Sequence, residues 1–276
     1  MFKGVIAGNH FITENLLTGL TRDGAIDPEE YCVADTTQEL CNEWARKFHV
    51  RTTTNPIDFV SSAAFLIFAF HHDALDGIMR KIAPKIRRDT LILSAMHRTK
   101  IADIEKYLPD HQIIRLVLNP SVVSGAGVGA FAANKNATVD AKSAAQIIIK
   151  NLGSMIEVES EEQLEEMRNF ILANTFMSYL TVKSMVDAGC KIGLTAKDAG
   201  FIAGKILDGA VKTLVEDRQR GIAMLQQAYQ KDILNEAIAL IKTYGIYDSV
   251  DKVITKDDFI EPEAKRPVQR YKWLER

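Results

Sequence analysis

The sequence predicts an α/β domain followed by an all-helical domain, and two observations support this. Over residues 1–158, short unbroken apolar runs alternate with segments of helical periodicity, which is typical of a parallel sheet covered by helices on both faces. Beyond Glu159 the apolar runs stop and long stretches of helical spacing follow. We therefore expect one domain over 1–158, a helical domain over 159–256, and a charged, loosely ordered tail over 257–276.

Each predicted strand is a run of apolar residues bounded by polar or turn-forming residues. The expected strands cover residues 4–7, 31–34, 64–69, 90–95 and 113–118. Between some of them, apolar residues recur at the spacing of one helix face. The expected helices cover residues 13–20, 37–48 and 101–107. Alternation of this kind favours a doubly wound α/β fold.

The helical part begins at a capping motif. The Ser160 hydroxyl can accept from a free backbone N–H while Gln163 reaches back, and helical spacing then continues to Gly189, a natural stop. Thr195, with an acidic residue three positions later, begins a second long helix, and a third is expected over 222–243. Long helices without strands indicate a separate all-α domain.

Composition narrows the class of protein. The chain has 276 residues, 47% of them hydrophobic and 25% charged, with a formal net charge of -2. This is ordinary for a globular protein, and the absence of clustered Lys and Arg predicts no nucleic-acid partner. The longest apolar run, residues 63–70, is too short to span a bilayer, so no membrane partner is expected. The odd, scattered set of cysteines argues against a disulfide framework and favours the reducing cytoplasm.

Three stretches carry a resemblance to a known family. Ala7-Gly8-Asn9 follows the first strand, where that family has a Gly-Ala-Gly-Asn loop. Residues 115–119, followed by Gly125-Ala126-Gly127, resemble its Arg-Val-Met-Pro-Asn segment, and residues 187–194 resemble its Asp-Ala-Gly-Val-Lys-Leu-Gly-Leu turn. Over about residues 3–250 the chain is thus similar to the pyrroline-5-carboxylate reductases. The resemblance implies a Rossmann-like domain, a helical dimerisation domain, a homodimer and a small-molecule ligand.

The first strand-to-helix turn is the predicted cofactor loop. In a Rossmann domain, glycines here let the backbone approach a pyrophosphate at the helix N-terminus. Of the fingerprint glycines only Gly8 is kept; Ile6 replaces the turn glycine, and Phe11 stands where a small residue lets helix pack on strand. Either this loop holds a dinucleotide or Gly8 is only a turn glycine. The candidate cofactor-binding residues of the loop are Ala7, Gly8, Asn9 and His10.

Two further residues bear on a dinucleotide. Asp35 ends the second strand, where a carboxylate can accept both ribose hydroxyls and repel a 2′-phosphate. If a cofactor binds, NAD(H) is therefore favoured over NADP(H); the alternative is that Asp35 caps the next helix. The resemblance also places Asn119 near the nicotinamide.

Histidines gather just past the carboxyl ends of predicted strands. Open α/β sheets bind ligands in the crevice outside those ends. The histidines could bind an anion, could bind a divalent metal, or could be loop residues with no shared task. We count His71 and His97 with the cofactor-binding residues and assign no metal. The histidines concerned are His10, His71, His72 and His97.

The catalytic signatures of the family are replaced. Its Ser-Gly-Ser-Gly-Pro-Ala-Tyr segment falls on residues 171–177 and its Ser-Pro-Gly-Gly-Thr-Thr segment on 229–234, and bulky or charged residues stand in both. Hydride transfer depends on positioning, which those small residues supply. Asn174, Thr175 and Lys183 remain as catalytic candidates, with solvated or helix-capping side chains as the alternative.

Two classes of function follow. The first is an NAD(P)-dependent oxidoreductase acting on a cyclic imine or related small carboxylate. The second is a non-catalytic dimeric relative that binds a nucleotide or other anion, or serves as an interaction or regulatory protein. Whether the chain is an enzyme stays open at this point.

Overall fold

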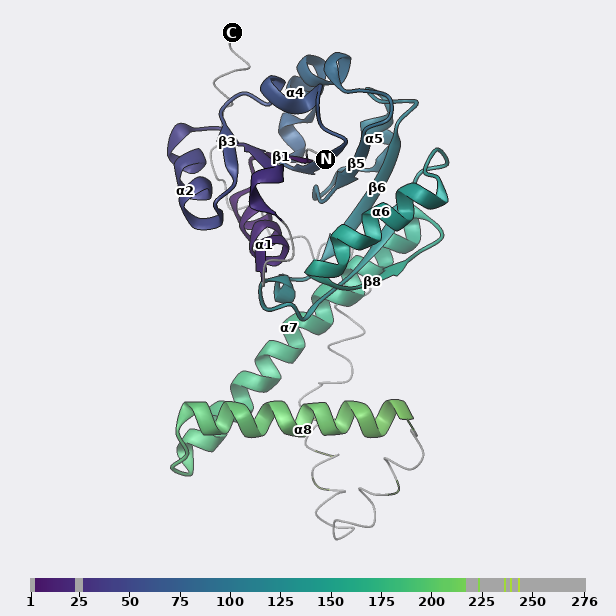
Figure 1. The fold of residues 1–276 in the computed structure, drawn as a ribbon. Helices are drawn as coiled ribbons and strands as arrows, with labels where there is room; N and C mark the ends of the chain where they lie inside the picture. Colours follow the sequence, from purple (N-terminus) through teal and green to yellow (C-terminus); the bar gives the residue numbers. More distant parts are fainter. Residues whose placement is uncertain are drawn as a thin grey trace. The chain divides into compact units, whose positions relative to one another are not determined.

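The computed structural model describes residues 3–22 and 27–216, and after them only isolated positions. The predicted helix over 222–243 lies almost wholly outside the described residues, as do the signature over 229–234 and the tail over 257–276. The chain forms two compact units that divide after Ile171 (Figure 1). The first unit holds the sheet, and the second holds most of the long helices.

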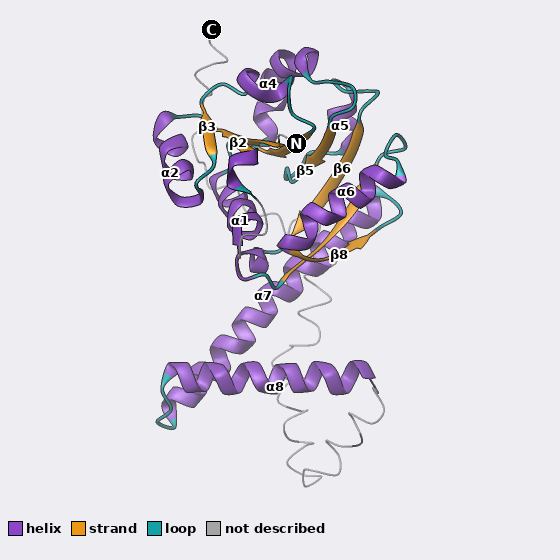
Figure 2. Cartoon of the chain, viewed as in Figure 1, coloured by secondary structure: helices purple, strands orange, loops and turns teal. Residues whose placement is uncertain are grey.

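One eight-stranded sheet organises the first unit, in the order β3-β2-β1-β4-β5-β6-β7-β8 (Figure 2). Strands β1 to β6 run parallel, β7 is antiparallel to β6, and β8 is parallel to β7. The predicted α/β fold is confirmed, and each predicted strand has its counterpart in the sheet. The strands are β1 Lys3–Ala7, β2 Tyr31–Ala34, β3 Arg51–Thr53, β4 Phe65–Ala69, β5 Leu91–Ser94, β6 Gln112–Leu118, β7 Gly127–Ala133 and β8 Gly153–Glu157.

Helices cover both faces of the sheet. Residues of α1, α2 and α6, among them Leu16, Trp44 and Ile149, form one apolar core with the strands. Residues of α3, α4 and α5, such as Ile78 and Ile104, form the other. Burial on both faces explains why the parallel strands are apolar throughout. The helices of this unit are α1 His10–Thr21, α2 Gln38–Phe48, α3 Ile57–Val60, α4 Leu75–Ile82, α5 Ile101–Glu105 and α6 Val139–Ile149, with short 3-10 turns at Pro28–Glu30, His72–Ala74, Ala83–Lys85, Pro120–Ser124 and Lys150–Leu152.

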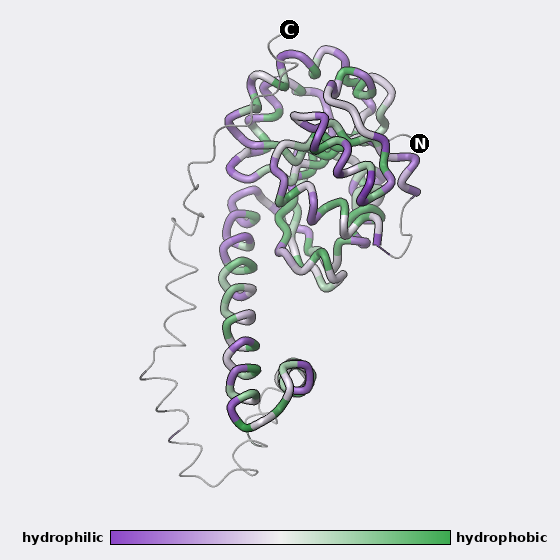
Figure 3. The backbone as a smooth tube through the Cα atoms, turned by 90° about the vertical axis from the view of Figure 1, so that its left-hand side faces the viewer, coloured by the Kyte–Doolittle hydropathy of each residue, from purple (hydrophilic) through white to green (hydrophobic). Residues whose placement is uncertain are grey.

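Two long helices follow the sheet: α7, Glu161–Lys191, and α8, Ala196–Glu216. The expected capping motif begins α7, because Gln163 donates its backbone N–H to Ser160 Oγ at 3.1 Å. The middle turns of α7 are coloured hydrophobic in Figure 3. No helix among residues 3–22 and 27–216 is long and apolar enough to cross a membrane.

The predicted stop at Gly189 is wrong. Helix α7 continues to Lys191, and the glycine in left-handed conformation is Gly193, with φ 94°. Gly189 instead lies where α7 and α8 meet. A Cβ added there would lie 2.7 Å from Ala199 Cβ, so the missing side chain permits the close approach. The predicted start of α8 is confirmed, because Asp198 donates its backbone N–H to Thr195 Oγ1 at 3.1 Å.

A buried arginine ties the sheet to the first turns of α7. Arg115, in the middle of β6, is 1% exposed. Its guanidinium reaches Glu161 Oε1 at 2.8 Å and Glu165 Oε1 at 2.5 Å. Glu161 Oε1 also accepts from the backbone N–H of Ile101 at 2.8 Å, which brings the start of α5 into the same network. A buried charge is tolerated only with partners of this kind.

We predict that Arg115→Met lowers the free energy of unfolding by roughly 3–5 kcal/mol, because Glu161 and Glu165 both lose the buried guanidinium with which they are paired. Urea denaturation measures the change. The matched control is Arg88→Met, since Arg88 lies at the surface in an exposed pair with Asp110 and such pairs contribute about 1 kcal/mol or less. Equal losses in the two variants would show that the buried network contributes no more than a surface pair.

Candidate functional site

The β1–α1 loop lies at the carboxyl end of a central strand. Ala7 ends β1, Gly8 turns the chain with φ 145°, and the Asn9 backbone N–H donates to Ala69 O at 3.0 Å. Asn9 then caps α1, because its Oδ1 accepts from the Ile12 N–H at 3.3 Å. The turn thus needs a glycine and delivers a capped helix N-terminus to the sheet edge. Backbone N–H groups and the helix dipole favour an anion at such a place.

The structure shows where the two bulky residues of the fingerprint lie. Ile6, which replaces the turn glycine, is in β1 and packs into the core with residues such as Cys32 and Phe68. Phe11 was expected to intrude between helix and strand, but 54% of its surface is exposed. The helix therefore packs on the strand without contribution from Phe11.

Asp35 follows β2, and its carboxylate is directed into the protein. Trp44 donates its indole N–H to Asp35 Oδ2 at 2.7 Å, and the Thr36 N–H donates to Oδ1 at 2.6 Å. The residue is 2% exposed. Burial raises the pKa of the Asp35 carboxyl, and the hydrogen bond from Trp44 opposes that rise. The alternative role of Asp35 as a helix cap is wrong, because the cap of α2 is Thr37, which accepts from the Leu40 N–H at 3.3 Å.

His10 lies over Trp44 at the start of α1. The ring centroids are 4.7 Å apart, and His10 Nε2 lies 3.5 Å from Glu43 Oε1. Glu14 lies 3.9 Å from the other ring nitrogen and also pairs with Lys47. These contacts join α1 to α2 above the buried Asp35–Trp44 pair.

Two of the other histidines belong to loops that touch. His72 Nδ1 lies 3.0 Å from Thr99 Oγ1, and that hydroxyl donates to His97 O at 3.4 Å. His71 is 3.3 Å from Asp73 Oδ2. Across the described ranges there is no group of three or more His, Cys, Asp or Glu suited to a metal ion. The loops after β4 and β5 are thus brought together, while His10 is held toward α2.

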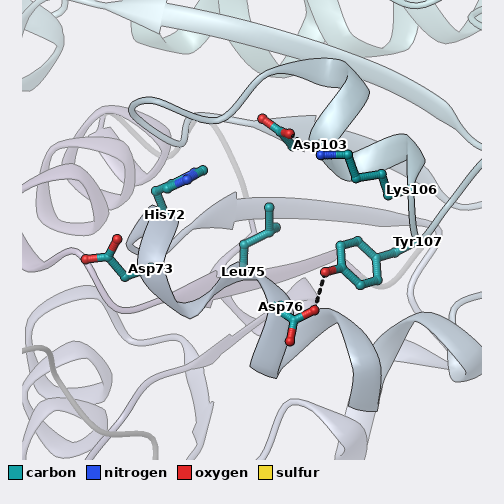
Figure 4. Close-up of a pocket in the computed structure, with 7 residues that line it drawn as sticks. All are labelled: His72, Asp73, Leu75, Asp76, Asp103, Lys106 and Tyr107. Atoms are coloured by element: carbon teal, nitrogen blue, oxygen red, sulfur yellow. Dashed lines mark hydrogen bonds and ion pairs between the residues drawn. The ribbon is translucent and has the colours of Figure 1, made fainter.

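A pocket of about 320 Å³ opens beside these loops (Figure 4). Its acidic groups are already paired: Tyr107 Oη donates to Asp76 Oδ1 at 2.5 Å, and Lys106 Nζ donates to Asp103 Oδ1 at 2.8 Å. Pairing of this kind reduces what the pocket can offer a cation. The residues that line it are His72, Asp73, Leu75, Asp76, Asp103, Lys106 and Tyr107.

Asn119 is buried where β6 passes into β7. Its Oδ1 accepts from the Val128 N–H at 2.9 Å, and its own N–H donates to Val128 O at 3.0 Å. The side-chain oxygen of Asn119 therefore stabilises the connection between the two strands.

The catalytic candidates lie on α7 in the second unit. Lys183 Nζ contacts Asp187 Oδ2 at 2.5 Å, and the side chain is largely exposed. Asn174 and Thr175 are half-buried, and Ala173 beside them is fully buried. Within this segment the Lys183–Asp187 contact is an ordinary surface pair between neighbouring turns.

Basic side chains near His97 were not singled out from the sequence. Arg168, two turns into α7, is 9% exposed and lies 3.1 Å from Glu165 Oε2. Burial lowers the pKa of the His97 imidazole, and the nearby Arg168 lowers it further. A charged residue inside an apolar strand, such as Arg115, was the available signal for this network, because it must meet acidic partners somewhere in the fold.

The described residues meet some of the requirements of a dinucleotide-binding site and fail others. The glycine turn and the start of α1 fit a phosphate group. The carboxylate expected to meet the adenosine ribose does not fit, because Asp35 is buried and bonded to Trp44. No cation stands within residues 35–39, where a 2′-phosphate would lie.

Comparisons with known proteins find one family model and several pyrroline-5-carboxylate reductases to which the chain is similar. A family model described as "NADP oxidoreductase coenzyme F420-dependent" matches residues 4–98. The pyrroline-5-carboxylate reductase of Synechocystis is 24% identical over 216 residues, covering 78% of this chain and 80% of that protein. That of Mycobacterium tuberculosis is 25% identical over 223 residues, covering 78% of this chain and 75% of that protein. These matches confirm the resemblance predicted from the three sequence stretches.

Solved structures agree on the fold. The pyrroline-5-carboxylate reductase from Coxiella burnetii has a TM-score of 0.75 at 21% identity, covering 92% of this chain and 94% of that one. The Plasmodium falciparum pyrroline carboxylate reductase, solved with NADP bound, has a TM-score of 0.79 at 16% identity, with the same shares covered. The likeness therefore extends over nearly the whole of each chain.

We predict that Trp44→Phe lowers the free energy of unfolding by about 1.5–3 kcal/mol, because the buried Asp35 carboxylate loses a charge-assisted donor. Urea denaturation followed by circular dichroism measures the change. In an Asp35→Asn background, Trp44→Phe should lower the free energy of unfolding by less, because the acceptor no longer carries a charge. The difference between the two losses is the coupling energy of the two side chains. An equal cost in both backgrounds would show that Trp44 acts by packing alone.

Proposed function

We propose, for a chain similar in sequence and fold to the pyrroline-5-carboxylate reductases, that it is an NAD(P)-linked oxidoreductase acting on a cyclic imine or a related small carboxylate. The observation that carries the proposal is the β1–α1 turn. A glycine at φ 145° leads from a central parallel strand into a capped helix. This is the arrangement that holds a pyrophosphate in dinucleotide-binding domains. Residues 7–10 would hold it, and the bound cofactor would supply or accept the hydride.

NAD(H) is the preferred cofactor under this proposal. A 2′-phosphate would meet no cation in the β2–α2 turn and would face the acidic side chains of Asp35, Glu39 and Glu43. Because Asp35 is buried, it acts on this choice through its charge rather than by hydrogen bonds to the ribose. The proposed preference is therefore for a cofactor that lacks the 2′-phosphate.

The chain's own residues would position the reactants. His71, His97 and Asn119 follow the strands at the carboxyl edge of the sheet, where open α/β sheets bind ligands. Hydride transfer requires little acid–base chemistry from these groups, so orientation of the ring is the main task assigned to them. The polar candidates Asn174, Thr175 and Lys183 belong to the second unit and are proposed separately.

A non-catalytic relative is the second candidate, and a specific observation favours it. Where the family has a small serine, Ile171 is 3% exposed and packs on β7 with Leu164 and Ala130. A residue committed to the core in this way cannot present bare backbone to a ligand. Such a protein would bind a nucleotide or anion, or act as an interaction or regulatory protein, without turnover.

We also propose a homodimer formed through the second unit, in the cytoplasm. Large apolar side chains are exposed along α7 and α8, and exposed patches of this kind mark protein interfaces. The free, exposed thiol of Cys190 suits a reducing compartment. The exposed apolar residues include Phe176, Tyr179, Leu180, Phe201, Ile202 and Ile206.

Nucleotide binding tests the proposed function. At a concentration of NADH 100-fold above its Kd, the free energy of unfolding should rise by about 2.7 kcal/mol, and NADPH should give a smaller rise. Thermal-shift assays measure both. In Gly8→Ala the rise with NADH should disappear, because the turn's φ of 145° is rarely adopted by other residues.

Gly209→Ala is the matched control, since a Cβ there meets open space. It should keep the full response to NADH. If neither NADH, NADPH nor ADP-ribose stabilises the wild-type chain, the oxidoreductase proposal is wrong. If NADH binds but pyrroline-5-carboxylate and related imines are not reduced, the non-catalytic candidate is favoured.

The dimer is tested by its mass in solution. Light scattering should give twice the 30.8 kDa of one chain. Ile206→Glu should shift the protein to the monomer, because a carboxylate on the apolar face loses hydration when the helices associate. Lys212→Glu adds the same group at an exposed polar position and should leave the dimer intact. A monomeric wild-type chain would contradict the proposal.

A further inference from the structure

A cluster of charged side chains lies where β5 and β6 adjoin the first turns of α7, all of it within the first unit. Arg115 lies opposite Ser94, the last residue of β5. Its guanidinium is paired with Glu161 and Glu165, and Arg168 lies 3.1 Å from Glu165. Two carboxylates thus balance two guanidinium groups.

Donors in this cluster outnumber acceptors. Among the residues that the structure describes, the buried Nε atoms of Arg115 and Arg168 have no hydrogen-bond acceptor, and the 3.1 Å contact of Arg168 Nε with Glu165 is an ion pair outside hydrogen-bond geometry. Arg168 Nη2 donates to Asn169 Oδ1 at 3.2 Å. Buried donors without acceptors are uncommon and call for an explanation such as a bound group.

His97 and Arg98 add basic groups in the loop after β5. Arg98 is exposed and has φ 59°, a left-handed conformation that arginine seldom adopts. Strained residues of this kind persist where the surroundings fix them, and they concentrate at ligand sites. The loop is held by Thr99, which is bonded to His97 O and lies against His72.

The charges around His97 are predominantly positive. The pKa of His97 is lowered by burial first, then by Arg168, and also by Arg98 and Arg115; Glu165 alone among the charged neighbours that act on it opposes this. Burial disfavours any charge at this place, whereas the positive charges of Arg168, Arg98 and Arg115 favour an anion over a cation there. The neighbouring acid groups, Glu161 and Glu165, are already paired with arginine.

We propose that His97, Arg98 and Arg168 form the binding site for the carboxylate of the substrate. The proposal rests on the proposed function and deepens it. A guanidinium provides parallel N–H donors that match a carboxylate, and imidazole adds one more.

Isothermal titration of the full chain with pyrrole-2-carboxylate tests the site. Pyrrole-2-carboxamide is the neutral control, and inorganic phosphate tests whether the site prefers another anion. Arg168→Gln should raise the Kd for pyrrole-2-carboxylate at least tenfold, and His97→Gln should raise it several-fold. Arg88→Gln, which removes an exposed arginine paired with Asp110, should leave it unchanged.

The outcomes separate this site from the oxidoreductase proposal. If wild type does not bind pyrrole-2-carboxylate, binds the carboxamide equally, or binds phosphate more tightly, the carboxylate site is wrong. Unchanged binding in both the Arg168 and His97 variants would overturn it as well. NADH is titrated in parallel: carboxylate binding that depends on Arg168 without any NADH binding would leave the site standing and remove the oxidoreductase.

Folding is controlled separately, because Arg168→Gln unpairs one oxygen of Glu165. Circular dichroism and the thermal midpoint show whether that variant is native. His97→Gln and Arg98→Gln leave the Arg115, Glu161, Glu165 and Arg168 pairs in place. If Arg168→Gln does not fold, these two variants decide the proposal by the same titration.

Discussion

The ion pairs of Arg115 are the contacts on which the rest of the candidate site depends. They fix the start of α7 against β6, and through the Ile101 N–H they fix the start of α5. Arg168 is carried into place because it lies one turn beyond Glu165 on the same helix. A buried arginine paired with two carboxylates restricts the orientation of α7 more than apolar contacts do. Its hydrogen bonds are lost when the helix rotates or slides.

The sequence predicted β1, β2, β4, β5 and β6 because burial on both faces demands continuous apolar runs. It did not predict β3 and β8, nor β7, whose residues are mostly glycine and alanine. Those glycines are required by close packing, since a Cβ on Gly129 would lie 2.2 Å from Val117 O. The same signal, a glycine, led to the wrong helix end at Gly189, where the cause is again contact with a neighbouring element. Local rules cannot distinguish a glycine that turns the chain from one that permits close approach.

The sequence indicated which loops lie at the edge of the sheet, but it did not indicate where their side chains point. Loops after parallel strands meet at one edge of the sheet, which is why the turn at Gly8 and the loops of His72 and His97 could be located from sequence. The direction of a side chain is a different matter. Asp35 has the position of a ribose acceptor, yet Trp44, nine residues later, takes its carboxylate inward. That depends on the packing of α2 against α1, which no spacing within the strand indicates.

These observations point to a change in how the protein can hold a ligand. Small residues at this point of α7 would leave room for a ligand against the helix, whereas Ile171 fills that room by packing on the sheet. A protein that loses such room can recover affinity with side-chain donors that lie near the same edge of the sheet. Arg168 lies on the first turns of that helix and His97 on the facing loop, and both are held by neighbours that a ligand need not displace. Charge-assisted bonds from such groups are stronger than those from neutral amides, so a small number of them can replace a larger backbone cradle.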